Sequence, residues 1–265
     1  YVQTGSRYGQ GSMPYYGENP EFGAAITYYA KEIPKTKKEE RLKKEKELFE
    51  NGEKIPQPTV AELKAEKRQQ KPYFLFTIKD EAGNIVKEIF KSAKKGVNRL
   101  TWNLEYNGFN SINVDEFKPT NNKNESGFPV LPGKYSVSMY QVFDGERKPL
   151  AGPVEFQAVT LKNTTLPAGN RNEQVAFQNQ LKKLIMAMNG AEGYMKEMEK
   201  RIASVRQTIQ NTPNVPFDLG IQAQNIAHKL DDINFKLDGT QAKASWEEVP
   251  PAIMPLNNRV RHIVW

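Results

Sequence analysis

The stretch LKKLIMAMNGAEGYMKEMEKRIASVRQTI, residues 181–209, repeats apolar residues at the spacing of a coiled coil. One set recurs every seven residues, and a second set lies three positions after the first. The sets are Leu181, Met188, Met195, Ile202 and Ile209, and Leu184, Ala191, Met198 and Val205. Interlocked sets of this kind are the a and d positions of a heptad repeat, which places an apolar stripe on one side of a helix. We therefore expect a helix over about residues 172–211, with its stripe against another helix.

The next segment supplies that partner. After the linker TPNVP, residues 212–216, the same spacing returns in two further sets, Leu219, Ile226 and Ile233, and Ala223, Leu230 and Leu237. Two heptad helices with a short proline-containing link predict an antiparallel helical hairpin over residues 171–240. Since the first helix is the longer one, its free end needs another partner. The C-terminal segment 241–265 is the candidate, with a further helix expected from Pro255 onward.

The chain before the hairpin has the alternation of β-strands. YFLFTIKDEAGNIVKEIF, residues 73–90, reads as two strands around the turn DEAGN, and GVNRLTW follows at 96–102. A later hairpin places Tyr135, Val137 and Met139 on one face. With a first strand at 24–29, these short strands predict an antiparallel Ig-like β-sandwich over residues 24–165, with Trp102 as its core aromatic residue. The predicted fold class is therefore α+β, a sandwich followed by a long helical hairpin.

A charged segment at residues 35–71 interrupts the predicted sandwich after its first strand. It reads as two helices, at about 37–51 and 59–70, with Gly52 after the first and Thr59 as the N-cap of the second. Its acidic and basic residues are interleaved, which is typical of solvated helices with pairs four residues apart. We expect a surface-lying helical insertion with few apolar residues.

Composition narrows the functional classes. The formal net charge is +7, and much of the excess of basic residues lies in this interleaved segment. The charge therefore favours ordinary solvation over nucleic-acid binding. The absence of cysteine excludes disulfides, thiolate nucleophiles and cysteine-bound zinc. No apolar run is long enough for a membrane-spanning helix. We expect no nucleic-acid partner and no membrane span.

No pattern of reactive residues predicts catalysis, a cofactor or a metal. His228 lies in the second hairpin helix and His262 in the C-terminal segment, and neither has neighbours that complete a metal site. A glycosidase needs two carboxyl groups facing one bond, and Asp115, Glu116 and Glu125 in a polar loop are the candidates. Their ordinary interpretation is loop solvation. We expect this chain not to be an enzyme, and leave open that the whole protein is one.

Exposed aromatic residues and a methionine-rich helix suggest an interaction surface. The candidate residues are Tyr15, Tyr16, Met186, Met195, Met198 and Trp246. Methionine side chains adapt to partners of different shape, which suits a docking groove. Their ordinary interpretation is the core of the hairpin.

Several segments together resemble a known family. The chain is similar to the C-terminal region of bacterial sortilin-type β-propeller proteins. The similarity lies in GENPEFGAAITYYAKE at 17–32, IKDEAGNIVKEI at 78–89, KKGVNRLTWNLEY at 94–106, LPGKYSVSM at 131–139, the helical hairpin and EEVPPAIMPLNNRV at 247–260. Such proteins are often described as BNR-repeat or glycosyl-hydrolase-like. The middle part also resembles the Ig-like domain of the flagellar hook-capping protein. The insertion at 35–71 departs from the family pattern.

The resemblance implies a location and a role. Residues 1–23 would be a linker from an upstream propeller, and the chain a non-catalytic accessory or scaffold region that packs on this propeller. The parent protein would be secreted, periplasmic or on the surface of a bacterial cell, where another envelope or secretion-system protein is a further expected partner. The alternatives are part of a glycoside hydrolase-like enzyme and a carbohydrate-binding module.

Overall fold

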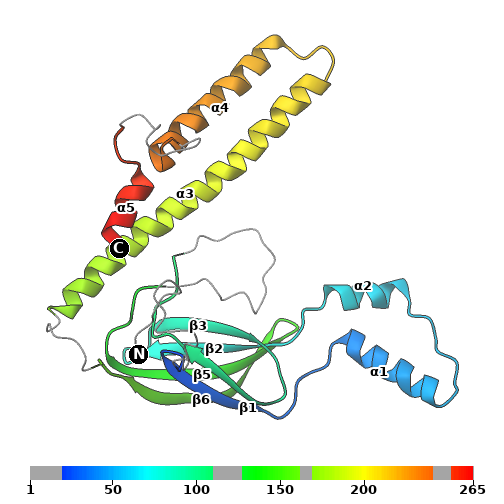
Figure 1. Cartoon of the computed structure of the whole chain (residues 1–265). Helices are drawn as coiled ribbons and strands as arrows, with labels where there is room; N and C mark the ends of the chain where they lie inside the picture. Colours follow the sequence, from blue (N-terminus) through cyan, green and yellow to red (C-terminus); the bar gives the residue numbers. More distant parts are fainter. Residues whose placement is uncertain (1–19, 110–126, 162–168, 241–251, 265) are drawn as a thin grey trace, which may run out of the picture. The chain divides into compact units, whose positions relative to one another are not determined.

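The computed structural model describes residues 20–109, 127–161, 169–240 and 252–264 (Figure 1). The chain divides into two compact units. The first comprises Tyr1–Gly108 and Lys118–Pro167, and the second Phe109–Phe117 and Ala168–Trp265. Over the described residues the fold is mixed α+β, with two antiparallel sheets and five helices. The α+β prediction is therefore confirmed at this level.

The first unit holds both sheets. Strand β1 (Ala24–Ala30) pairs antiparallel with β4 (Gly96–Trp102). The second sheet has the order β3-β2-β5-β6, and all its neighbours are antiparallel. Its strands are β2 (Tyr73–Asp80), β3 (Ile85–Ser92), β5 (Gly133–Phe143) and β6 (Glu146–Ala158). The strands expected around the turn DEAGN are present, with Gly83 at a positive φ of 83° in that turn.

One hydrophobic core joins the two sheets. Leu100 and Trp102 from β4 belong to the same buried cluster as side chains from β2, β3 and β5. Trp102 is 1% exposed and meets Tyr135 and Phe156 edge to face, with ring centroids 5.4 and 5.9 Å apart. Val137 and Met139 are buried on the same face of β5 as Tyr135. Trp102 is thus a buried core residue, and the three residues of β5 share one buried face, as predicted.

The charged insertion forms two capped helices, α1 (Lys37–Glu50) and α2 (Val60–Arg68). Thr36 and Thr59 each accept a hydrogen bond from the backbone of a glutamate three residues later, whose side chain in turn accepts one from the threonine N–H. This reciprocal capping box satisfies N–H groups that a helix leaves unpaired. Neither helix has a buried residue, as expected for a surface-lying insertion.

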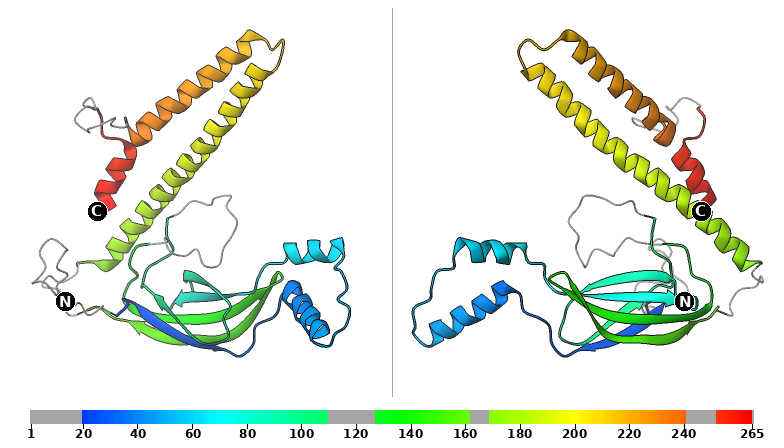
Figure 2. Two further views of the ribbon diagram at one scale, coloured as in Figure 1. Left: turned by 45° about the vertical axis from the view of Figure 1, so that its right-hand side comes forward. Right: turned by 180° about the vertical axis from the view of Figure 1, so that it is seen from behind.

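The second unit is helical. Helix α3 (Arg171–Asn211) is 41 residues long, and α4 (Phe217–Asp238) returns along it in the opposite direction (Figures 1 and 2). Helix α5 (Leu256–Val264) begins after Pro255, as expected, and packs on this hairpin. No helix among the described residues is both long and apolar enough to cross a bilayer.

Candidate interaction surface

The contact between α3 and α4, here called the seam, uses half of the predicted heptad residues. Met195 of α3 and Ala223 and Leu237 of α4 are its buried residues, whereas Leu181, the other buried residue of α3, lies nearer the free N-terminal end, beyond the length that α4 covers. Each belongs to a set that recurs every seven residues, so the helices meet along one stripe on each. The buried residues of both helices thus come from predicted heptad sets.

Polar side chains complete the seam where the sequence predicted apolar ones. The Nδ2 atom of Asn234 on α4 donates to Oε1 of Glu199 on α3. Asn257 of α5 donates to Glu192 on α3 and, over 2.7 Å, to Asp238 at the end of α4. Hydrogen bonds to a carboxylate are stronger than those between neutral groups, and partly buried polar groups need such partners. The contact between α3 and α4 therefore includes Glu199, and Glu192 bonds to α5, whereas the sequence predicted Leu184 and Ala191 on this side of α3.

The remaining heptad residues form a second surface. On each helix, these residues lie three positions after the buried set of the seam. In an antiparallel pair, one helix is related to the other by a half turn about an axis perpendicular to both. Residues three positions after the buried set therefore project to the same side of the pair from both helices. We call this surface the outer apolar face, and it consists of Leu184, Ala191, Met198 and Val205 from α3 and Leu219, Ile226 and Ile233 from α4. Its leucine, isoleucine and valine residues are 43–50% exposed.

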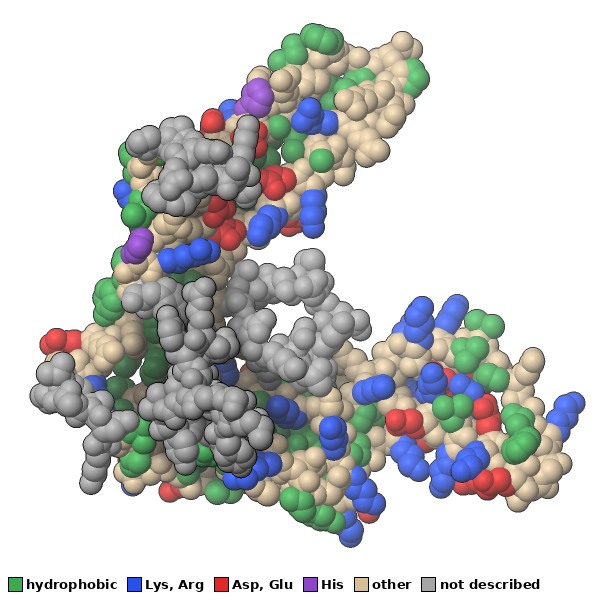
Figure 3. Space-filling model, in the orientation of Figure 1, with side chains coloured by type: hydrophobic (Ala, Val, Ile, Leu, Met, Phe, Trp, Pro, Cys, Tyr) green, Lys and Arg blue, Asp and Glu red, His purple; other side chains and the backbone are tan. Residues whose placement is uncertain are grey.

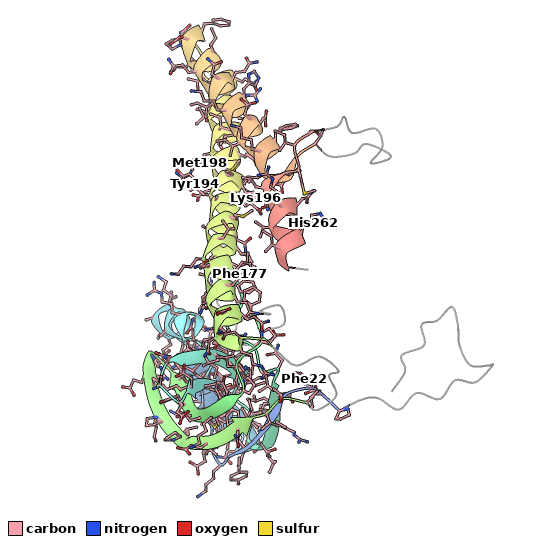
Figure 4. The ribbon with its side chains drawn as sticks, turned by 90° about the vertical axis from the view of Figure 1, so that its left-hand side faces the viewer. Phe22, Phe177, Tyr194, Lys196, Met198 and His262 are labelled. Atoms are coloured by element: carbon pink, nitrogen blue, oxygen red, sulfur yellow. The ribbon has the colours of Figure 1, made fainter. Side chains whose placement is uncertain are left out.

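The side chains of α3 show this division. In Figure 4, Tyr194 and Met198 project together from one side of α3, whereas Lys196 projects from another. Tyr194 is four residues before Met198, so it borders the outer apolar face. Phe177 is exposed as well, but it points to a different side in this view. Hydrophobic side chains are also visible along the surface of the hairpin in Figure 3.

The six residues predicted as an interaction surface are not gathered in one place. Met198 lies on the outer apolar face, whereas Met195 is 6% exposed and belongs to the seam. Met186 is exposed on a different side of α3 from Met198, because a separation of twelve residues corresponds to three full turns of an α-helix plus about 120°. The aromatic residues Tyr15, Tyr16 and Trp246 lie outside the described residues.

Sequence reasoning missed Ile226 and Ile233 as surface residues because it placed both in the seam. The sequence held no local signal for the alternative, because two interlocked apolar sets, at a and d, are what a single seam between two helices uses. Which set would be buried depends on Asn234 and Asn257, whose partners are 35 and 65 residues away in the sequence.

Among the described residues no group of three or more histidine, aspartate or glutamate side chains could hold a metal ion. His228 and His262 are exposed. The carboxyl residues Asp115, Glu116 and Glu125 of the alternative enzyme hypothesis lie outside the described part of the chain.

The clearest pKa shifts in the two-sheet unit belong to buried tyrosines. Burial raises the pKa of Tyr135 to about 12, with smaller contributions from Tyr106 and Asp80. Burial also raises the pKa of Tyr106, and Asp80 adds to this effect. The hydroxyl of Tyr135 donates to the carbonyl of Leu131. These groups stay neutral at physiological pH and act as packing and hydrogen-bonding groups.

A buried lysine in the same unit also has a structural partner. Lys87 is 7% exposed and donates from Nζ to the carbonyl of Tyr106 over 3.3 Å. Glu105, next in the chain to Tyr106, accepts from the backbone N–H of Gly127 over 3.1 Å, and its own carbonyl accepts from Nε1 of Trp102. These bonds tie the segment after β4 to the core.

Comparison with known proteins found no family model, no curated protein and no solved structure that matches this chain. Hydrophobic residues scattered singly over a surface are ordinary, but a contiguous set on one side of two helices is typical of a contact surface.

Proposed function

We propose that the chain is a non-catalytic accessory region that binds another protein surface through its helical hairpin. The outer apolar face is the observation that carries this proposal. Exposed leucine, isoleucine and valine at heptad positions of two adjacent helices are positioned to be covered by further helical or sheet surface. An enzyme site would instead require facing polar groups in a concave, water-excluding place.

We further propose that the two-sheet unit is an Ig-like sandwich. Two features support this assignment. A buried tryptophan, Trp102, packs between sheets, and Tyr135 near the start of β5 donates from its hydroxyl to a backbone carbonyl four residues upstream. A core tryptophan and a tyrosine corner of this kind recur in Ig-like domains.

The parent protein and its location are proposed from the sequence resemblance. In this proposal the chain belongs to a secreted, periplasmic or surface-exposed bacterial protein with an upstream sortilin-type propeller. The propeller would pack near β1, the strand that follows the connector at residues 1–23. Tyr29 of β1 and its cross-strand partner Val97 are both largely exposed there, which gives the propeller an apolar contact. Another envelope or secretion-system protein is the further partner.

Substrate assays test the non-catalytic role. The purified chain is incubated with aryl glycosides, oligosaccharides and peptides, and we expect no turnover above buffer. Turnover that Glu125→Gln or Asp115→Asn abolishes, while Glu155→Gln on exposed β6 leaves it unchanged, would refute the proposal and favour the glycoside hydrolase-like alternative. Saturable quenching of tryptophan fluorescence by a glycan would favour the carbohydrate-binding alternative.

A further inference from the structure

The outer apolar face is about as large as one side of a homodimer interface. By area scales, complete exposure of an aliphatic side chain adds about 100 Å² of apolar surface, so half exposure adds about 50 Å². The seven residues of the face together with Tyr194 then present on the order of 400 Å². A standard interface covers about 800 Å² per partner, of which about two thirds is apolar in homodimers, or roughly 500 Å².

The face is also suited to a second copy of itself. It consists of two stripes from antiparallel helices, and an antiparallel pair has an approximate two-fold axis of its own. A two-fold symmetric contact requires a self-complementary surface, in which each residue set can meet its equivalent or the neighbouring set. Two such hairpins stacked face to face would make a four-helix bundle in which adjacent helices are antiparallel, a common and stable arrangement.

The distribution of charge agrees with burial of this side. None of the seven positions of the face carries a charge, although 26% of the whole chain is charged. Arg201, which borders the face one turn beyond Met198, is paired with Glu197 on its own helix. On α4, Lys229 and Lys236 border the face one turn beyond Ile226 and Ile233; both are exposed, and long lysine side chains keep their charge in water while their apolar stems cover a surface.

We propose that the occupant of the outer apolar face is a second copy of this chain, which forms a two-fold symmetric four-helix bundle through α3 and α4. This inference rests on the proposed binding role of the hairpin and names its partner. The packing of the two-sheet unit on an upstream domain is a separate contact near β1 and is not altered by it.

The mass of the purified chain in solution tests the inference. Light scattering and sedimentation are measured from about 1 to about 200 μM, the range in which standard-size interfaces of moderate affinity become populated. We expect the mass to rise towards twice 30.2 kDa. The double variant Ile226→Lys/Ile233→Lys is expected to remain monomeric, with at least a tenfold loss of association.

Helix α4 provides a matched control for this variant. Ile221 and Phe235 are exposed to the same degree as Ile226 and Ile233 but lie on the opposite side of the helix. Ile221→Lys/Phe235→Lys is therefore expected to dimerise as the natural chain does. Circular dichroism of both double variants establishes that the helices are retained.

A second readout avoids charged substitutions. The chain has no cysteine, so Ile226→Cys introduces a single thiol on the face and Phe235→Cys one outside it. We expect the labelling rate of the Ile226→Cys thiol to fall several-fold as concentration rises, and that of Phe235→Cys to stay constant. A mass of 30.2 kDa throughout, or equal behaviour of face and control variants, would overturn the inference. Such a result would leave the non-catalytic role to be judged by the substrate assays.

Discussion

Two methionines three residues apart on α3 give a direct comparison between the seam and the outer apolar face. Met195 is 6% exposed in the seam, whereas Met198 projects from the outer apolar face (Figure 4). Substitution of each by alanine removes the same atoms from the same helix and changes helix propensity equally. Any difference in stability between the two variants therefore reports burial.

The expected magnitudes follow from that burial. Truncation of a buried methionine to alanine costs about 2–5 kcal/mol, and Met195→Ala should fall at the lower end, about 2–3 kcal/mol, because a two-helix contact can partly close the cavity. Met198 is of intermediate burial, less exposed than the leucine, isoleucine and valine residues of the face, so Met198→Ala should cost about 1 kcal/mol in a monomer. We therefore expect a difference of about 1.5 kcal/mol between the variants.

Urea unfolding followed by far-ultraviolet circular dichroism measures this difference, because α3 and α4 contribute most of the helical signal. The comparison is made at about 1 μM, where an interface of moderate affinity is largely dissociated. Equal losses for the two variants, or a larger loss for Met198→Ala at this concentration, would refute the assignment of seam and face. A cost of Met198→Ala that grows with protein concentration would agree with self-association.

Three other perturbations test the two-sheet unit and the insertion. Trp102→Ala should destabilise the first unit by about 3–5 kcal/mol, measured by thermal unfolding of the sheet signal, because its side chain is almost completely buried. Burial raises the pKa of Tyr135 to about 12. The stability that the neutral, buried hydroxyl contributes is therefore complete below pH 10 and is lost as pH rises towards 12. Ultraviolet titration with Tyr135→Phe as the control checks this. Hydrogen bonds from the N-cap backbone lower the pKa values of Glu39 and Glu62. Capping of α1 and α2 by these carboxylates is therefore retained above pH 4.5 and lost as pH falls through the lowered pKa values. Hydrogen exchange of the first-turn amides should accelerate in that pH range.

Local patterns in the sequence predicted most elements because the determinants of each are close together. Thr59 was expected as the N-cap of α2, and it forms a capping box with Glu62. Thr36 was not named, although the sequence Thr36-Lys37-Lys38-Glu39 has the same spacing of threonine and glutamate. The strands around Gly83 were equally local, since a turn and two alternating flanks determine such a hairpin.

Long-range pairing set the limit of prediction in the helical unit. A heptad repeat predicts that both apolar sets of a helix share one seam. In the structure, residues such as Ile226 and Ile233 of the second set are instead about half exposed. Which set is buried depends on Glu192 and Glu199, which read as solvated charges in the sequence and are bonded to distant asparagines in the structure. Prediction of the outer apolar face would have required knowledge of these bonds between distant residues. The predicted seam therefore included a second apolar set that is exposed in the structure.

The small number of buried side chains in the hairpin links its stability to its surface. Among the described residues, only Leu181 and Met195 are buried on the 41-residue α3, and only Ala223 and Leu237 on α4. Long helices in proteins are stabilised mainly by packing of an apolar side rather than by intrinsic propensity. A hairpin with so thin a seam gains much of its possible stabilisation from whatever covers Ile226 and Ile233. Binding at the outer apolar face and folding of the hairpin are therefore expected to be coupled, because a partner that binds only the folded helices shifts the equilibrium towards them.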